Sequence, residues 1–486
     1  MVRTEKKGTF EFALRPHRVE ASTLDKHADV LGMIEILLGV TPRHCRYSYI
    51  WPPSYETMST LVPNLFNVPA CDFGVGAIDG GLRSLVAYVV SRSYGCSYCA
   101  AHCAGLGTVW RGDGIYFPKN AQAMVPDPDR STFTRKELAA INIGKKLGPV
   151  PTQVVTSADI KDMASVYTVE EQEDVVLCAV LMGYLNRYMD TIGMTLELEP
   201  LENSMEHLAA TGWTAGISYD EEVDEDLMEE DREAAVMREE KKKATWCGGL
   251  GFIKMLLMAK KEGSANLKGI PTSDKMVRQT CLDVAGFAPY YMSGAGSPRR
   301  ANARSAFVWA FTLRLCRGSE EVPARVKHMM GYICATFAGN TILRAHFAFM
   351  VHSHGTPISD LVAITAREAS VGDVTIDSED RGTAAKLAAA LALARAASAT
   401  PSTVTPELVT QIMWLYKPAG VIELITTVSL VTMFLRWTAV YKPEQYEPEI
   451  LAFVREHGGQ LSIDTENSCT DEESGWSATA SEIRRG

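Results

Sequence analysis

The chain has 486 residues, of which 46% are hydrophobic and 22% are charged, and its formal net charge is −11. This composition is typical of folded globular proteins, and the length predicts two or three domains rather than one ordinary core. The acidic balance argues against a nucleic-acid-binding surface and against attraction to an anionic membrane. Small acidic ligands are not excluded, because a local basic pocket need not show in the total charge.

Residues 1–16 carry basic side chains but no apolar segment, so we expect no secretory signal. The longest apolar run, residues 423–436, is shorter than the about 20 residues that span a bilayer. The eleven cysteines are mostly scattered, unlike a secreted disulfide framework. The sequence therefore predicts a cytoplasmic protein without a membrane or nucleic-acid partner.

Apolar residues between positions 82 and 90 recur at the spacing of one helical face: Leu82, Leu85, Val86, Val89 and Val90. Gly95 is expected to end this helix, because glycine tolerates the left-handed conformation at a helix C-terminus. A second helix would then begin at about Cys96 or Ser97. The short stretch GCSYCAAHC therefore opens a helix with a cysteine pair.

Cys96 and Cys99 fall in the first turn of that helix, three residues apart and on one side. Exposed N–H groups and the positive end of the helix dipole favour a thiolate there, and two sulfurs at this spacing can form a disulfide. His102 follows one turn later and can exchange a proton with a thiol. The pattern favours a redox pair. Zinc, iron–sulfur or purely structural cysteines are the alternatives, although no second ligand pair is evident.

Two further cysteines near this motif have simpler interpretations. Cys103 is expected to be a packed thiol, with a spare exchange role as the alternative. Cys45 follows His44 in a predicted turn, and His44 is a candidate long-range partner of His102. Elsewhere, His352 and His354 form a pair that nothing in the sequence ties to the thiols.

The remaining elements are also predicted to be helices. Residues 168–193 read as a long helix with an acidic start, and residues 384–399 consist of strong helix formers. Residues 220–243 carry a dense run of charge, predicted to be a solvated helix or mobile connector, with an acidic docking segment as the alternative. No convincing strand pattern is present, so the fold class is all-α.

A collinear series of matches indicates two diverged copies of one helical unit. SYGCSYCAAH, which ends at His102, aligns with TFAGNTILRAH, which ends at His346. GVTP at residues 39–42 resembles GFAP at 286–289, and Arg187 matches Arg436. The second copy has Asn340 where the first has Cys96, and Leu343 where it has Cys99.

We predict an N-terminal extension (1–24), a unit with the cysteine pair (25–205), a charged connector (206–274), a degenerate unit (275–458) and a disordered tail (459–486), which contains Cys469. Since one copy can supply contacts that relatives make between subunits, the two units are expected to form an intramolecular pseudo-dimer. Further self-association is left open.

The stretch LRSLVAYVVSRSYGCSYCAAHCAGLG resembles the alkylhydroperoxidase D-like, or carboxymuconolactone decarboxylase-like, family. The resemblance implies an all-α fold, a peroxidatic cysteine at Cys99, a resolving cysteine at Cys96 and a proton relay through His102. Members of this family usually carry a glutamate twelve residues before the first cysteine. Here that position is Ser84, which cannot take up a proton at neutral pH. In the second copy the matching residue is His328.

These features predict a thiol-dependent peroxidase or disulfide oxidoreductase that acts through Cys96, Cys99, His102 and Ser84. Its partners would be a peroxide or small organic substrate and a dithiol reductant protein, and no metal or organic cofactor is expected. One alternative is a non-redox relative that acts on a lactone or carboxylic acid by proton transfer. The other is a binding or assembly protein, in which the degenerate copy and the acidic middle contact a partner.

Overall fold

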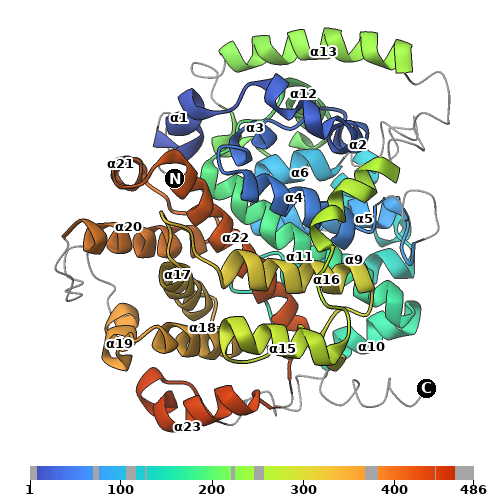
Figure 1. Ribbon diagram of the computed structural model, residues 1–486. Helices are drawn as coiled ribbons and strands as arrows, with labels where there is room; N and C mark the ends of the chain where they lie inside the picture. Colours follow the sequence, from blue (N-terminus) through green and yellow to red (C-terminus); the bar gives the residue numbers. More distant parts are fainter. Residues whose placement is uncertain are drawn as a thin grey trace.

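The computed structural model describes residues 8–68, 70, 76–104, 116–125, 129–219, 225–245, 257–366, 381–443 and 445–465. Within these ranges the regular elements are all helices and no strand is present, which confirms the predicted all-α class (Figure 1).

The helices follow one another in two series, separated by a helix in the charged middle of the chain. The first series is α1 (Phe10–Leu14), α2 (Ala28–Leu38), α3 (His44–Ser48), α4 (Pro52–Leu65), α5 (Gly80–Tyr94), α6 (Ser97–Ala104), α8 (Tyr116–Gln122), α9 (Arg135–Leu147), α10 (Ser157–Val166), α11 (Val169–Ile192) and α12 (Leu198–His207). After α13 (Glu225–Thr245), the second series is α15 (Asp274–Ala285), α16 (Ala301–Trp309), α17 (Ala324–Phe337), α18 (Thr341–Ser353), α19 (Ile358–Ala366), α20 (Arg381–Ser398), α21 (Pro406–Leu415), α22 (Pro418–Val440) and α23 (Pro448–Leu461).

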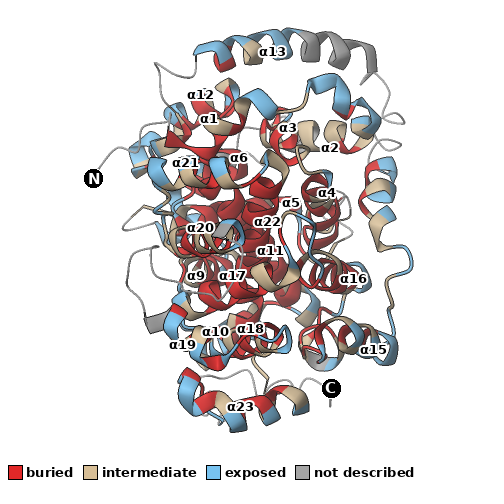
Figure 2. Cartoon of the chain, turned by 60° about the vertical axis from the view of Figure 1, so that its left-hand side comes forward, coloured by how far each residue is buried: buried red, intermediate tan, exposed pale blue. Residues whose placement is uncertain are grey.

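Two long helices, α11 and α22, pack against each other through the middle of the molecule. Figure 2 shows both of them buried along most of their length, surrounded by shorter helices with exposed outer faces. Helix α11 begins where Thr168 and Glu171 form reciprocal side-chain bonds to the backbone, and it ends at left-handed Gly193. Its interior is apolar on every side, which is typical of a helix surrounded by others.

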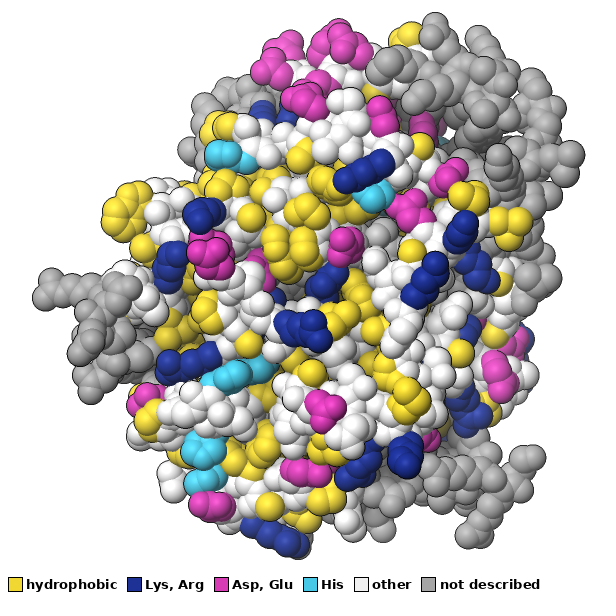
Figure 3. All heavy atoms as spheres, in the orientation of Figure 1, with side chains coloured by type: hydrophobic (Ala, Val, Ile, Leu, Met, Phe, Trp, Pro, Cys, Tyr) yellow, Lys and Arg dark blue, Asp and Glu magenta, His cyan; other side chains and the backbone are white. Residues whose placement is uncertain are grey.

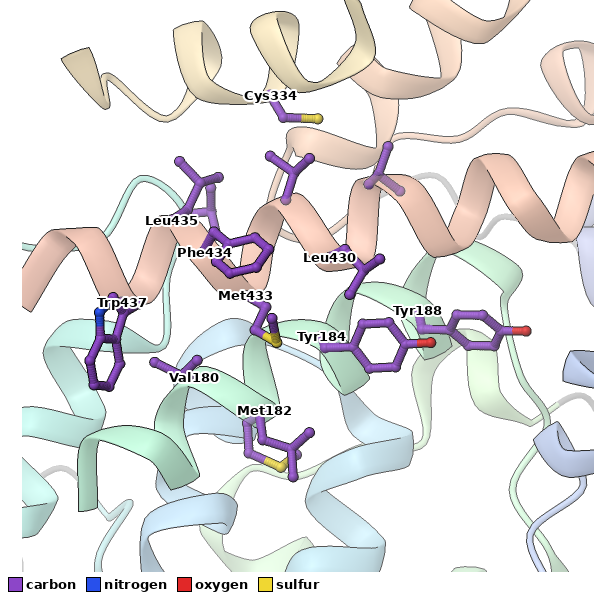
Figure 4. Close-up of a cluster of buried hydrophobic side chains, with 14 of the residues drawn as sticks. Val180, Met182, Tyr184, Tyr188, Cys334, Leu430, Met433, Phe434, Leu435 and Trp437 are labelled. Atoms are coloured by element: carbon purple, nitrogen blue, oxygen red, sulfur yellow. The ribbon is translucent and has the colours of Figure 1, made fainter. Parts of the chain in front are cut away.

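The interface between α11 and α22 is the centre of the hydrophobic core. Figure 4 shows Val180 and Tyr184 of α11 on the side that faces α22, and Leu430 and Met433 of α22 on the side that faces α11. Of the described helices, α22 alone is long and apolar enough to cross a membrane, but 89% of its most apolar stretch is buried inside the protein. The helix is longer than the apolar run noted in the sequence, and its burial makes it part of the hydrophobic core.

Each of these two helices sends one buried arginine to the end of a helix in the opposite series. The Arg187 guanidinium donates to the carbonyls of Ser398 (3.2 Å) and Ala399 (2.7 Å), just where α20 ends. The Arg436 guanidinium donates to the carbonyl of Gly148 (2.7 Å), just after α9. Because helix C-termini leave carbonyls without partners, these contacts satisfy polar groups that would otherwise be buried unpaired.

The charged middle of the chain contains α13, which runs along one end of the molecule, where acidic side chains gather on the surface (Figures 1 and 3). Its first turns are docked, because Leu227 and Met228 are buried. The Asp231 carboxylate accepts from the Arg43 guanidinium and from the backbone N–H of Leu198 (2.7 Å). This part of the segment is therefore a fixed surface helix.

The ends of the described chain are also packed. Phe10 and Leu14 of α1 are fully buried, although they belong to the predicted N-terminal extension. Helix α23 continues to Leu461, which lies inside the predicted tail. The rest of that tail beyond residue 465, with Cys469, lies outside the described residues.

Replacing Phe434 by alanine should lower the free energy of unfolding by about 3–5 kcal/mol, because this ring is fully buried among other aromatic rings and would leave a cavity. The matched control is Phe337→Ala, since Phe337 is 47% exposed on α17 and its loss should cost less than about 1 kcal/mol. Urea unfolding followed by circular dichroism measures both. Equal losses would contradict a core centred on α22.

Candidate functional site

The cysteine pair is positioned by the sharp turn between α5 and α6. The Asp79 side chain caps the start of α5 by accepting from Leu82 N–H (2.8 Å), and Gly95 ends the helix with φ of +93°. The N–H groups of Gly95 and Cys96 both donate to the Ser91 carbonyl at 3.0 Å, which closes the last turn. Helix α6 then starts at Ser97, as the sequence predicts, so Cys96 is the residue immediately before its first turn.

The Cys96 sulfur occupies the place of a capping oxygen, because it accepts the backbone N–H of Cys99 at 3.4 Å. The positive end of the helix dipole lies at this position. Cys99 is also buried, and burial together with a hydrogen bond to Cys96 raises the pKa of its thiol well above the usual value. The structure holds both cysteines as free thiols.

His102 makes a buried hydrogen bond with Glu197, which directly precedes α12. The distance between His102 Nε2 and Glu197 Oε2 is 2.8 Å, and the two side chains are 5% and 3% exposed. Glu197 Oε1 accepts from the Tyr98 hydroxyl at 2.9 Å and from the Arg43 backbone N–H at 2.6 Å. This one carboxylate therefore ties the thiol helix to the start of α12 and to the residue before α3.

The protonation states of this network follow from burial and charge. Burial acts to raise the pKa of Glu197, but the charge and hydrogen bond of His102 and the nearby Arg43 outweigh it and lower the pKa to about 2. Glu197 is therefore an anion at neutral pH. His102 Nδ1 is buried and has no hydrogen-bond partner. Because Nε2 is bonded to Glu197, Nδ1 is the ring nitrogen of His102 that remains for proton exchange.

The predicted Ser84 lies elsewhere in this arrangement. Its hydroxyl donates to the Cys103 carbonyl (2.8 Å) and accepts from the Asn120 side chain (3.1 Å), so it joins α5, α6 and α8. Cys103 itself is buried, which raises the pKa of its thiol to about 12. The carboxylate that bonds to His102 is Glu197, which the sequence analysis missed.

His44 does come to the site from α3. Its Nδ1 lies 3.5 Å from the Tyr98 hydroxyl, and burial lowers the pKa of His44 to about 4, so it is neutral. The adjacent Cys45 instead packs in a separate small cluster with Leu24 and Tyr55. Within the described ranges, no group of three or more His, Cys, Asp or Glu side chains is arranged to hold a metal ion.

The second series contains the same acid–base pair without the thiols. His346 Nε2 lies 2.9 Å from Glu447 Oε2, and Glu447 Oε1 accepts from the Tyr290 N–H at 2.7 Å. Asn340 takes the capping role of Cys96, because its side-chain oxygen accepts the Leu343 N–H at 2.9 Å.

The carboxylates offer a signal that the sequence alone contains. Glu197 follows the first long helix and directly precedes α12, and Glu447 follows the second and directly precedes α23. The predicted repeat, extended to these positions, marks Glu197 as a candidate site residue but does not identify His102 as its partner. His328 lies in another cluster, where its Nδ1 is 3.1 Å from His354 Nε2.

Comparisons with known proteins give little beyond this geometry. No protein-family model matches the sequence, and a search of curated proteins found no match. Among solved structures, the chain is similar to the debrominase Bmp8 in its apo form, with 19% identity over 39% of this chain and 95% of that one, and a TM-score of 0.34. A cysteine-to-alanine variant of that debrominase in complex with 2,3,4-tribromopyrrole gives 18% identity, the same coverage and a TM-score of 0.33.

The depressed pKa of Glu197 links the stability of the protein to acid pH. A carboxylate with a lowered folded-state pKa stabilises the fold above its unfolded value, and that contribution is lost as the pH falls from about 4.5 to about 2. Glu197→Gln should therefore flatten this part of the stability curve, by roughly 3 kcal/mol. Urea titrations at several pH values measure it. Parallel curves for the variant and wild type would contradict an ionised Glu197.

Proposed function

We propose that the protein is a thiol-dependent oxidoreductase, a peroxidase or a disulfide reductase, in which Cys96 and Cys99 alternate between dithiol and disulfide. The observation that carries the proposal is the buried His102–Glu197 hydrogen bond one helical turn from the two thiols. A structural cysteine pair has no need for a base. Here the base is held by an anion and has a free ring nitrogen.

The proposed reaction begins with the transfer of the Cys99 proton to His102 Nδ1. The Cys99 thiolate attacks one oxygen of a peroxide and the O–O bond breaks, so that sulfur becomes a sulfenic acid and is oxidised. The leaving alkoxide or hydroxide takes the proton from His102. The Cys96 thiol then attacks the sulfenic sulfur, and a disulfide and water form. An external dithiol reduces that disulfide by exchange, which restores both thiols.

The division of labour between the cysteines follows from their environments. Cys96 receives a backbone N–H and lies at the mouth of α6, which suits the thiol that exchanges with an external dithiol. The pKa of Cys99 is raised by burial, so this thiol needs the base that His102 provides. Because Cys96, Cys99 and His102 are each less than one tenth exposed, the site suits a small peroxide or small organic substrate.

We also propose that the chain consists of two tandem copies of one helical unit that meet as an intramolecular pseudo-dimer. Three pairs of contacts support this arrangement: His102–Glu197 with His346–Glu447, Cys96–Cys99 with Asn340–Leu343, and the Arg187 with the Arg436 contacts. The two long helices that pack centrally come one from each copy. We place this protein in the cytoplasm, where a dithiol reductant protein would be available.

Substituting the relay should abolish most of the peroxide consumption measured with a dithiol reductant. His102→Asn and Glu197→Gln are each expected to lower the rate by about 10²–10⁴-fold, the usual contribution of a general base. Cys99→Ser should remove the activity, and Cys96→Ser should allow one turnover without recycling. The measurement is the initial rate of peroxide loss per mole of enzyme.

The second copy provides matched controls for these variants. His346→Asn and Glu447→Gln remove an equally buried hydrogen-bonded pair, but no thiol lies beside it. Both should retain wild-type activity within about threefold if they fold. If wild type consumes no peroxide and its two thiols never form a disulfide, the non-redox and binding alternatives gain support instead.

A further inference from the structure

One buried cation of the second series lies beside the thiol helix of the first. Arg436 is fully buried, and its guanidinium donates to the carbonyls of Ala179 (2.9 Å) and Gly148 (2.7 Å). The guanidinium carbon is 5.6 Å from the centre of the Tyr94 ring. Because Tyr94 is the last residue of α5 and Cys96 follows two residues later, Arg436 is held at the turn that positions the thiols.

Arg436 lacks a hydrogen bond that the corresponding arginine of the first copy makes through its Nε atom. Arg187, the matching arginine, uses its Nε to donate to the Thr432 hydroxyl at 3.2 Å. The residue of the first copy that corresponds to Thr432 is Gly183, which has no side chain to accept a hydrogen bond. A Cβ atom at Gly183 would lie 3.0 Å from Arg436 Cδ, so a larger residue at this position would crowd the arginine side chain. Arg436 Nε is left buried without a hydrogen-bond partner.

Arg436 also lacks a carboxylate. Among the described residues, no Asp or Glu forms an ion pair with it, whereas a buried charge is normally paired. Burial, with a smaller contribution from the charge of Arg187, lowers the pKa of Arg436 to about 9, and the groups that act to raise it are Tyr94, Cys99 and Cys96. The ionisable groups near enough to supply a negative charge are thus a phenol and the two thiols.

We propose that Arg436 is the fixed positive charge of the thiol site, contributed by the second copy to offset negative charge on Cys96 and Cys99 of the first. This inference deepens the proposed oxidoreductase function and rests on it. Arg436 is a positioning residue in this account, since it acts on the sulfurs through its electrostatic field. The degenerate copy then has a chemical role although it lacks thiols.

The consequence of this charge differs between the two redox states. In the dithiol state a thiolate at either cysteine partly neutralises a guanidinium that has no other anion. In the disulfide state both sulfurs are neutral, and the charge of Arg436 is unbalanced. A cation in this position therefore favours the reduced form and makes the disulfide a stronger oxidant of external dithiols.

Other titratable groups around the thiols act in both directions. Asp190 of α11 opposes a thiolate at Cys99, but it accepts the Ser402 N–H at 2.8 Å, and burial raises its pKa. The remaining neighbours are Tyr94, Tyr98 and Cys103, whose pKa values burial raises, so that they are neutral at physiological pH. A second cation, Arg187 of the first copy, has its guanidinium carbon 5.1 Å from the centre of the Tyr94 ring. Arg436 is the cation that the second copy contributes.

The test compares Arg436→Gln with Arg436→Lys. Both substitutions remove the guanidinium and its hydrogen bonds to the Ala179 and Gly148 carbonyls, but lysine keeps a positive charge at this position. The guanidinium of Arg187 lies 5.1 Å from the centre of the same Tyr94 ring, so a substitution there is not a remote control. The readout is the pH dependence of alkylation at Cys96 and Cys99, followed for each peptide by mass spectrometry without any substrate. Arg436→Gln should raise the lower thiol pKa by about one unit and slow alkylation at pH 7 by about three- to tenfold. Arg436→Lys should change the rate by less than about threefold.

Two further measurements make the result decisive. In a glutathione redox titration, Arg436→Gln should shift the equilibrium toward the disulfide by about tenfold, whereas Arg436→Lys should stay within about threefold of wild type. If Arg436→Gln does not fold, the wild-type protein still tests the proposal. A pKa for Cys96 in folded Cys99→Ser above that of unfolded-chain cysteine, about 8.5, would overturn it. Unchanged alkylation profiles in folded Arg436→Gln would also overturn it.

The readouts separate this inference from the proposed function. Thiol pKa values and redox equilibria need no peroxide. If the enzyme consumes no peroxide but Arg436→Gln shifts the thiol pKa, the peroxidase proposal fails and the role of Arg436 stands. If peroxide is consumed and the thiol pKa is unchanged, the role of Arg436 fails alone.

Discussion

The packing of α11 against α22 is the constraint on which the rest of the molecule depends. Both helices are buried nearly all round, so their polar backbone is satisfied within the helix and their side chains form the core. Each helix then extends one arginine to the carbonyls that end a helix of the opposite series. Removal of either helix would expose the core and leave the ends of α9 and α20 without their donors.

Two buried charges near the thiols, Glu197 and Arg436, differ in how completely their hydrogen bonds are satisfied. Glu197 accepts three hydrogen bonds, from His102, Tyr98 and Arg43, and is stable as an anion. Arg436 keeps one N–H unused and has no carboxylate partner among the described residues. A fully satisfied charge holds a site in place, and the proposed role of Arg436 depends on its charge being incompletely satisfied.

The two series of helices also separate what the fold requires from what the chemistry requires. In both, the side chain just before a helix accepts a backbone N–H. The acceptor is the Cys96 sulfur before α6 and the Asn340 side-chain oxygen before α18. The cap is therefore a structural need that either residue meets. The histidine–glutamate pair recurs likewise, whereas the cysteine pair occupies this position in the first series alone.

The sequence by itself determined the all-α class, the turn at Gly95, the start of the thiol helix and the adjacency of Cys96, Cys99 and His102, because each depends on residues within about one or two turns. It also predicts a repeat, in which Arg187 corresponds to Arg436. Tertiary structure alone decided that Glu197, 95 positions after His102, is its partner and that Ser84 bonds to the end of α6 instead. It alone placed Arg436 beside the turn that carries the thiols. Helical periodicity and capping are local, whereas the partner of a buried charge is set by which distant segments the core brings together.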